Sequence, residues 1–160
     1  MLKAELGKFK KFDAKNYKVG IVAAQFNADI TTELLKFAKK MLTAYRVLPK
    51  NIEIVYVPGS VEIPVVLQAM AEKRIGKGSG KNKYDCLVAL GAVIRGETTH
   101  YDYVCKMVSE GVMRVALDYN IPVGFGVLTV ENKKQARERL GVGGGAVEAA
   151  LQTAKIIQEL

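Results

Sequence analysis

The stretch KVGIVAAQFNADITTELLKFAKKMLTAYR, residues 18–46, contains the pattern that decides the fold. Its first part, Lys18–Ala24, is short, apolar and rich in β-branched residues, which is typical of a strand. Its second part, Ile30–Arg46, repeats apolar residues at the spacing of one helix face. The residues on that face are Leu34, Leu35, Ala38, Met41, Leu42 and Tyr45. The stretch therefore predicts a buried strand followed by an amphipathic helix.

The same alternation continues along the rest of the chain. Further strands are predicted at Ile52–Val57, Asp85–Gly91 and Ile121–Thr129. Further helices are predicted at Val61–Arg74, Tyr101–Tyr119, Lys133–Leu140 and Ala146–Leu160, with the Gly-rich GVGGG (141–145) as a break before the last one. The strands are continuously apolar, so both faces of a parallel sheet are expected to be covered. This predicts an α/β fold, a three-layer αβα sandwich.

The 160 residues are expected to form a single domain, 1–160. Residues 1–17 are rich in lysine and are expected to be flexible or loosely attached; they lack the apolar run of a signal peptide. A second basic stretch, KRIGKGSGKNK (73–83), is expected to be solvated surface, and its Gly- and Lys-rich part, Gly76–Lys83, is expected to be an insertion-like loop between a helix and a strand. No apolar run approaches the roughly 18 residues of a membrane helix. A cytoplasmic protein without a membrane partner is predicted.

The net charge of +8 and the pI near 9.5 favour an anionic partner. The charge does not by itself choose between nucleic acid and a small phosphorylated substrate. The basic stretch 73–83 has no aromatic side chain for bases to stack on, both basic stretches are expected to be solvated surface, and no nucleic-acid partner is expected. The chain has two cysteines, Cys86 and Cys105, and a single histidine. These do not form the clustered ligand set of a zinc or iron site, and reduced, buried thiols are expected. We expect neither a metal nor an organic cofactor.

Ligands of open parallel sheets bind at the carboxyl ends of the strands. Four places meet that condition here: residues 25–27, residues 58–62, residues 91–102, and the stretch around Phe125 and after Thr129. Phe26 is unusual because a large aromatic follows a strand where polar turn residues are common. From the sequence it fits equally well as a cap on the core or as a platform for a planar ring.

The segment GAVIRGETTHYDYV (91–104) is the most informative of the four. It passes from a strand to a helix, with Gly96 at the turn and Thr98 or Thr99 available as the helix N-cap. The free N–H groups at such a helix start favour an anion. His100 stands in the first turn beside that position, where a structural and a catalytic role are about equally expected.

These segments resemble the signature stretches of the lumazine synthase family. The resemblance rests on FN with IT and a Leu-Leu helix (26–35), VPGSVEIP (57–64), GAVIRGETTHYDYVC (91–105) and PVGFGVLTVEN (122–132). They stand in the family's order and spacing, so the resemblance covers roughly residues 18–160. It implies a flavodoxin-like sandwich with a four-stranded parallel sheet. It also implies a homo-pentamer with active sites shared between neighbours, with pairing into decamers left open.

The resemblance implies a 6,7-dimethyl-8-ribityllumazine synthase. This transferase condenses 5-amino-6-(D-ribitylamino)uracil with 3,4-dihydroxy-2-butanone 4-phosphate, the penultimate step of riboflavin biosynthesis, without a cofactor. The implied pyrimidine and ribityl contacts are Phe26, Ser60, Val61, Glu62, Val93, Ile94 and, from across an interface, Phe125. The implied phosphate contacts are Gly96, Glu97, Thr98 and Arg139. His100 matches the family's proton-transfer histidine.

The sequence departs from the family pattern at one place, and it leaves one alternative function open. Many family members have a turn of the form Gly-x-Lys-x-Gly-Asn-Lys-Gly after the arginine, whereas no lysine stands between Arg139 and Lys155 here. A family lysine therefore has no counterpart, and assembly into an icosahedral shell is not expected. The alternative function is a non-catalytic, flavodoxin-like module that binds a flavin or nucleotide. Such a module favours a Ser/Thr-rich phosphate loop after the first strand, which QFNADITT (25–32) matches poorly.

Overall fold

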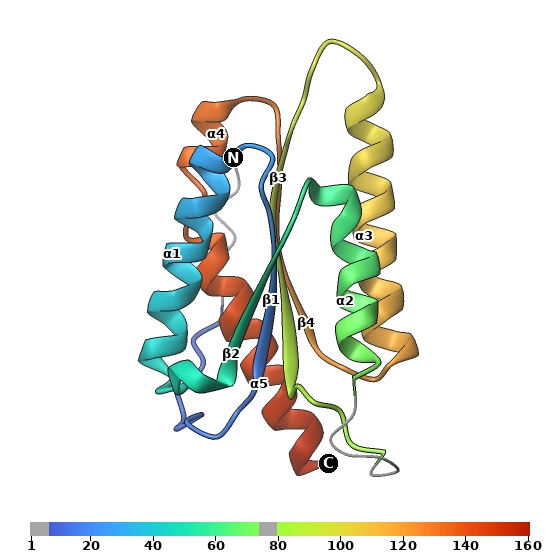
Figure 1. Ribbon diagram of the computed structural model, residues 1–160. Helices are drawn as coiled ribbons and strands as arrows, with labels where there is room; N and C mark the ends of the chain where they lie inside the picture. Colours follow the sequence, from blue (N-terminus) through green and yellow to red (C-terminus); the bar gives the residue numbers. More distant parts are fainter. Residues whose placement is uncertain (1–6, 74–79) are drawn as a thin grey trace.

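The computed structural model describes residues 7–73 and 80–160. Four parallel strands form one sheet in the order β2-β1-β3-β4. The strands are β1 (Val19–Ala24), β2 (Ile52–Val57), β3 (Cys86–Ile94) and β4 (Val123–Val130). Helices α1 (Ala28–Ala44), α4 (Lys133–Arg137) and α5 (Val142–Glu159) cover one face of the sheet, and α2 (Ile63–Ala71) and α3 (His100–Asp118) cover the other (Figure 1). The predicted three-layer α/β sandwich is confirmed.

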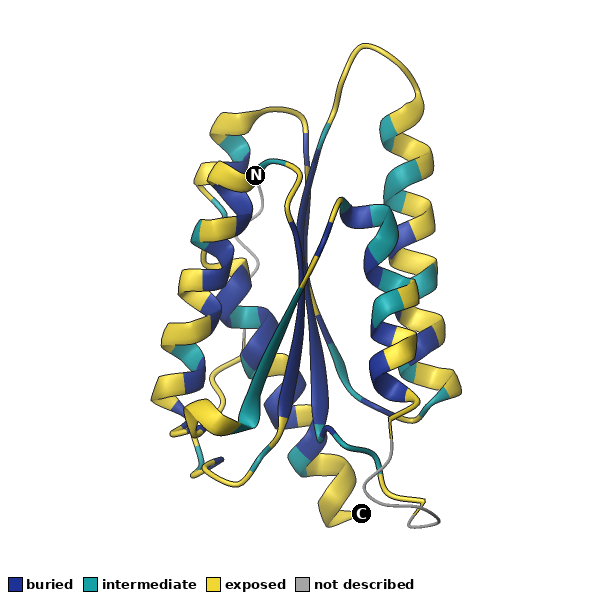
Figure 2. Ribbon diagram, in the orientation of Figure 1, coloured by how far each residue is buried: buried dark blue, intermediate teal, exposed yellow. Residues whose placement is uncertain are grey.

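The central strands are buried on both faces, as their continuous apolar runs predicted. Every residue of β1 is buried, and β3 is buried from Cys86 to Val93 (Figure 2). The β3 strand ends three residues beyond the predicted Asp85–Gly91, because Ala92–Ile94 stay in register with Leu128–Val130 of β4. This extension carries the end of β3 to the edge where ligands of parallel sheets bind.

Short 3₁₀ turns and a proline set the starts of two other elements. The 3₁₀ turn Pro49–Asn51 leads into β2, and a second one, Ser60–Glu62, follows β2 and leads into α2. Pro64 lies in the first turn of α2, where a missing backbone N–H breaks no helical hydrogen bond. Within the described part of the chain, no helix is both long and apolar enough to cross a membrane.

The Gly-rich segment 141–145 is not the break that its composition predicted. Helix α5 begins at Val142 and includes Gly143, Gly144 and Gly145 in its first turns. A Cβ atom at Gly143 would lie 2.1 Å from the backbone oxygen of Leu34 in α1. The glycines therefore allow α5 to pack directly on the backbone of α1, and this contact outweighs their low helix propensity.

The N-terminal segment contacts the α1 and α5 side of the molecule from Lys10 onward. The Ala14 backbone N–H donates to the Tyr45 oxygen at 2.8 Å, and the Gln152 side-chain amide donates to the Lys10 oxygen at 3.0 Å. The Phe12 ring meets the Tyr45 ring edge-on, with 5.3 Å between centroids. Residues 1–6 and 74–79, which include positions 76–79 of the predicted insertion-like loop, lie outside the described residues.

Candidate active site

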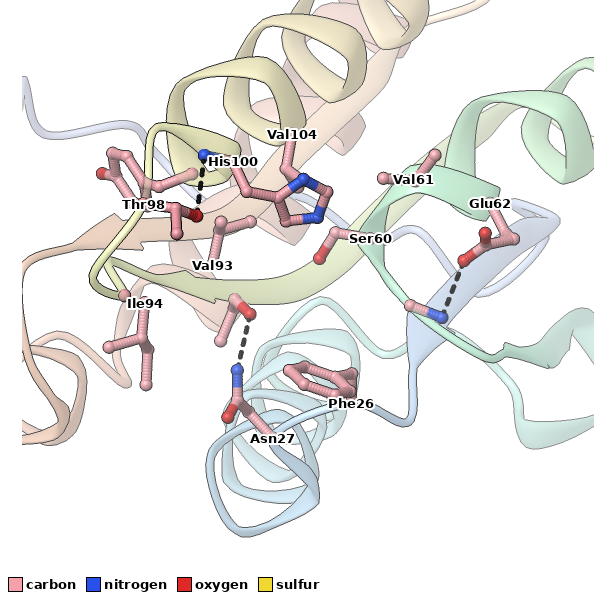
Figure 3. Close-up of a pocket in the computed structure, with 14 residues that line it drawn as sticks. Phe26, Asn27, Ser60, Val61, Glu62, Val93, Ile94, Thr98, His100 and Val104 are labelled. Carbon is pink, nitrogen blue, oxygen red and sulfur yellow. Dashed lines mark hydrogen bonds between the residues drawn. The ribbon is translucent and has the colours of Figure 1, made fainter.

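A pocket of about 340 Å³ opens at the carboxyl ends of β1, β2 and β3, where the chain passes into α1, α2 and α3 (Figure 3). Its lining is mostly apolar and includes a few polar side chains. The residues that line it are Phe26, Asn27, Gly59, Ser60, Val61, Glu62, Ala92, Val93, Ile94, Gly96, Thr98, His100, Tyr101 and Val104. Three of the four segments predicted from the strand ends thus contribute to one cavity.

The turn from β1 to α1 places an aromatic ring against the pocket. Asn27 adopts a left-handed backbone conformation (φ 58°), and its side-chain amide donates to the Ala92 oxygen of β3 at 3.0 Å. Asparagine is one of the few residues that tolerate this conformation. The Phe26 side chain beside it is 72% exposed, so it does not cap the core. The ring is available to a ligand, as Figure 3 shows.

The turn after β2 presents a hydroxyl and a carboxylate. The Glu62 carboxylate accepts a hydrogen bond from the Gly59 backbone N–H at 2.9 Å, which fixes its position at the rim. Ser60 is buried against β3, and a Cβ atom at Gly91 would lie 2.6 Å from the Ser60 Oγ. The absence of a side chain at Gly91 therefore makes the room that Ser60 occupies.

The turn from β3 to α3 carries the histidine. His100 is the first residue of α3, and its imidazole points into the pocket in Figure 3. Of the two threonines predicted as caps, the N-cap position is Thr99, but it makes no side-chain cap bond. The Thr98 hydroxyl instead accepts from the His100 backbone N–H at 3.3 Å. A polar, exposed loop (96–99) thus precedes the helix start, beside the imidazole.

Three of the predicted site residues do not line this pocket in the single chain. Glu97 lies in the exposed loop, and Phe125 lies on β4, where its side chain is 40% exposed. The Arg139 guanidinium donates to the Gln135 oxygen at 2.9 Å, just after α4. The other nine predicted residues all line the cavity.

Five lining residues were not singled out from the sequence: Asn27, Gly59, Ala92, Tyr101 and Val104. Asn27 and Gly59 lie in two of the segments predicted at the carboxyl ends of strands, so the sequence could have indicated them. Tyr101 and Val104 follow His100 by one and four residues on α3. The i,i+4 spacing of a helix places Val104 beside His100, and this was the available signal.

The cysteines are separate from this chemistry. Neither Cys86 nor Cys105 forms a disulfide; Cys86 is buried, as predicted, whereas Cys105 is only partly buried. Burial raises the pKa of the Cys86 thiol, which disfavours a reactive thiolate. Among residues 7–73 and 80–160, no group of three or more His, Cys, Asp or Glu side chains could hold a metal ion.

An apolar pocket with convergent polar groups at the carboxyl edge of a parallel sheet defines an α/β protein with a small-molecule site. The sequence profile of the 6,7-dimethyl-8-ribityllumazine synthase family matches residues 16–158. The chain is also 42% identical over 161 residues to a 6,7-dimethyl-8-ribityllumazine synthase of Polaromonas sp. strain JS666, covering 100% of this chain and 99% of that relative. The chain belongs to the 6,7-dimethyl-8-ribityllumazine synthase family. The predicted family and enzyme class, a transferase, are confirmed, and the non-catalytic alternative is not supported.

Proposed function

We propose that this pocket is where 5-amino-6-(D-ribitylamino)uracil condenses with 3,4-dihydroxy-2-butanone 4-phosphate to form 6,7-dimethyl-8-ribityllumazine, with release of phosphate and water. The observation that carries the proposal is the convergence of Phe26, Ser60, Glu62 and His100 on one cavity from three separate strand ends. An exposed ring, a fixed carboxylate and a titratable imidazole suit a planar, hydroxylated substrate that must exchange protons.

The pyrimidine is assigned to the side of the pocket formed by Phe26. Its ring offers an open face for stacking, and burying that face on a ligand is favourable. Ser60, Val61 and Glu62 lie along the next wall, where the hydroxyl and the carboxylate can bind the ribityl hydroxyls. Val93 and Ile94 line the same cavity at the end of β3, and their backbone groups are assigned to the pyrimidine ring.

The phosphate is assigned to the loop before α3. Gly96 and Thr98 line the cavity there, and the first backbone N–H groups of the 19-residue helix α3 favour a negative charge. Glu97 stands in the same loop, so its contribution is assigned to its backbone N–H, since its carboxylate would repel a phosphate.

His100 is assigned the proton transfers. The amine of the pyrimidine attacks the ketone to give a Schiff base with loss of water. Phosphate is then eliminated, and attack of the second nitrogen closes the ring with loss of water. Each step moves a proton to or from nitrogen or oxygen, and histidine is the side chain that most often carries such transfers as a general acid or base. Holding the two reactants together lowers much of the remaining barrier.

The assembly is proposed to be a cytoplasmic homo-pentamer, or a decamer of two pentamers, with shared sites. Phe125 and Arg139 do not line the pocket of their own chain. Phe125 lies exposed on β4, an edge strand of the sheet, where a second copy can reach it. We assign both residues to the pocket of a neighbouring subunit, where Arg139 would provide a planar fork for the phosphate.

The test is direct turnover. The purified protein is incubated with both substrates while the absorbance of the lumazine product and the released phosphate are followed together. Equal amounts of product and phosphate are expected, and omission of either substrate is the control. A correctly assembled protein that releases no product, or that releases phosphate without product, would rule out the proposed reaction.

A further inference from the structure

The loop that carries the proposed phosphate contacts has little support of its own. Residues 95–100 are all exposed, and the loop projects beyond the rest of the molecule at the top of Figure 1. A Cβ atom at Gly96 would meet nothing within 4 Å. An unsupported loop of this kind costs conformational entropy whenever a ligand orders it.

Arg95 bridges the two ends of this loop. Its backbone N–H donates to the Val130 oxygen at 2.9 Å, which holds the loop entrance to β4. Its guanidinium makes two parallel contacts with the Asp102 carboxylate in the first turn of α3, at 3.2 and 3.3 Å. The Arg95 Nε lies 2.9 Å from the Glu131 carboxylate just after β4. The same guanidinium lies over the Tyr101 ring, 4.1 Å from its centroid.

We propose that Arg95 is a positioning residue, which holds loop 96–99 and His100 in the geometry that binds the phosphate of the butanone substrate. Its guanidinium already faces two carboxylates, so it is not itself placed to bind phosphate. It acts through Tyr101, which lines the pocket, and through Asp102, which lies two residues after His100. This inference rests on the proposed function of the pocket.

A planar fork is needed for this role. A single exposed ion pair contributes little, but a bidentate arginine that also stacks on a ring defines one geometry. Lysine at position 95 would keep the charge but could neither make the bidentate contact with Asp102 nor stack a planar group on the Tyr101 ring. Arg95→Lys should therefore retain part of the effect, and Arg95→Gln should lose all of it.

A charge-matched double variant separates positioning from simple electrostatics. Arg95, Asp102 and Glu131 together carry a net charge of −1. In the double variant Arg95→Gln, Asp102→Asn, only Glu131 remains charged, so the net charge is again −1. If the cluster acts only through its charge, this variant binds phosphate like the wild type. If Arg95 positions the loop, the variant remains impaired.

The control is Arg46→Gln. Arg46 makes a simpler exposed contact with one carboxylate, 3.0 Å from Asp13, just beyond the far end of α1. That helix has 17 residues, so this site lies about 25 Å along α1 from the pocket. The control removes an arginine–aspartate pair without touching loop 96–99.

The experiment combines three measurements on the assembled enzyme. In Arg95→Gln and in the double variant, we expect about tenfold higher KM for the butanone phosphate and a lower kcat, with KM for the pyrimidine within twofold of wild type. Inorganic phosphate should bind more weakly by calorimetry, and amides 96–103 should exchange hydrogen faster without substrate. Arg46→Gln should match the wild type in all three.

Wild-type values in Arg95→Gln, or recovery in the double variant, would overturn the proposal. If Arg95→Gln does not assemble, Asp102→Asn and Glu131→Gln each remove one carboxylate partner of Arg95 instead. Unchanged hydrogen exchange of amides 96–103 in both of these variants would equally overturn the proposal. A wild-type enzyme that makes no lumazine would refute the proposed function instead. Phosphate binding and hydrogen exchange would still decide the role of Arg95.

Discussion

The Gly91–Ser60 contact leads to a quantitative prediction, because it couples the core of β3 to the pocket. In Gly91→Ala, the new Cβ atom would lie 2.6 Å from the Ser60 Oγ and 3.2 Å from Ile63 Cδ1. Overpacking of this kind costs about 1–3 kcal/mol, while replacing glycine by alanine in a strand returns about 0.5–1 kcal/mol. The net expected loss is centred on about 1 kcal/mol, within a range of about 0–2.5 kcal/mol, and a loss of about 1 kcal/mol is equivalent to a Tm lower by roughly 2–4 °C for a chain of this size.

Removing the Ser60 hydroxyl as well should restore most of the lost free energy of unfolding. In the double variant Ser60→Ala, Gly91→Ala, only the looser Ile63 contact remains, so the two substitutions should be coupled favourably by about 1–2 kcal/mol. The double-mutant cycle is measured by thermal and denaturant unfolding at one fixed protein concentration, since the stability of the proposed oligomer would depend on concentration. Gly91→Ala should also raise KM for the pyrimidine by displacing Ser60. Wild-type stability in Gly91→Ala, or strictly additive effects, would show that Ser60 does not need the space at Gly91.

Four further outcomes are expected. His100→Ala should lower kcat by about 10²-fold or less with the assembly intact, and unchanged turnover would remove the imidazole from the mechanism. Arg139→Lys should weaken the butanone phosphate and spare the pyrimidine, whereas unchanged phosphate affinity by calorimetry in Arg139→Ala would place the anion elsewhere. Gly143→Ala should destabilise the protein by about 1–3 kcal/mol in unfolding experiments, because its Cβ atom would meet the α1 backbone. Gly145→Ala should stabilise it by up to about 1 kcal/mol, because its Cβ atom would meet nothing within 4 Å. Equal effects of the two substitutions would contradict the packing argument. Light scattering or sedimentation should give the mass of five or ten chains, and a particle of sixty chains or an active monomer would refute the proposed assembly.

The order of strands and helices could be predicted because each element has a strong period of its own. The apolar runs of β1 and β3 and the helical stripe of α1 require no knowledge of their neighbours. The gathering of Phe26, Ser60 and His100 also followed from one rule about strand ends. Local pattern and a simple topology were sufficient for these features.

Other features depend on contacts between distant segments and left no local signal. Gly143 is helical because it lies against Leu34, more than a hundred residues earlier. The Asn27 side chain finds its acceptor on Ala92, and the backbone of Lys10 finds its donor on Gln152. Composition alone indicated a break at Gly143, and it gave no sign of the contact between Lys10 and Gln152. The roles of Phe125 and Arg139 stay predictions, because they depend on a second copy of the chain.

The glycines of this fold differ in how they constrain sequence drift. The obstacle to a side chain at Gly91 is the hydroxyl of Ser60, so a second substitution can relieve it. At Gly124 the obstacle is the backbone oxygen of Ala146, 2.0 Å from where a Cβ atom would lie. Every residue type carries that oxygen, so no single compensatory replacement can accommodate a larger residue there. Homologues can therefore exchange the Gly91–Ser60 pair together, whereas Gly124 can change only if helix α5 moves away from the sheet.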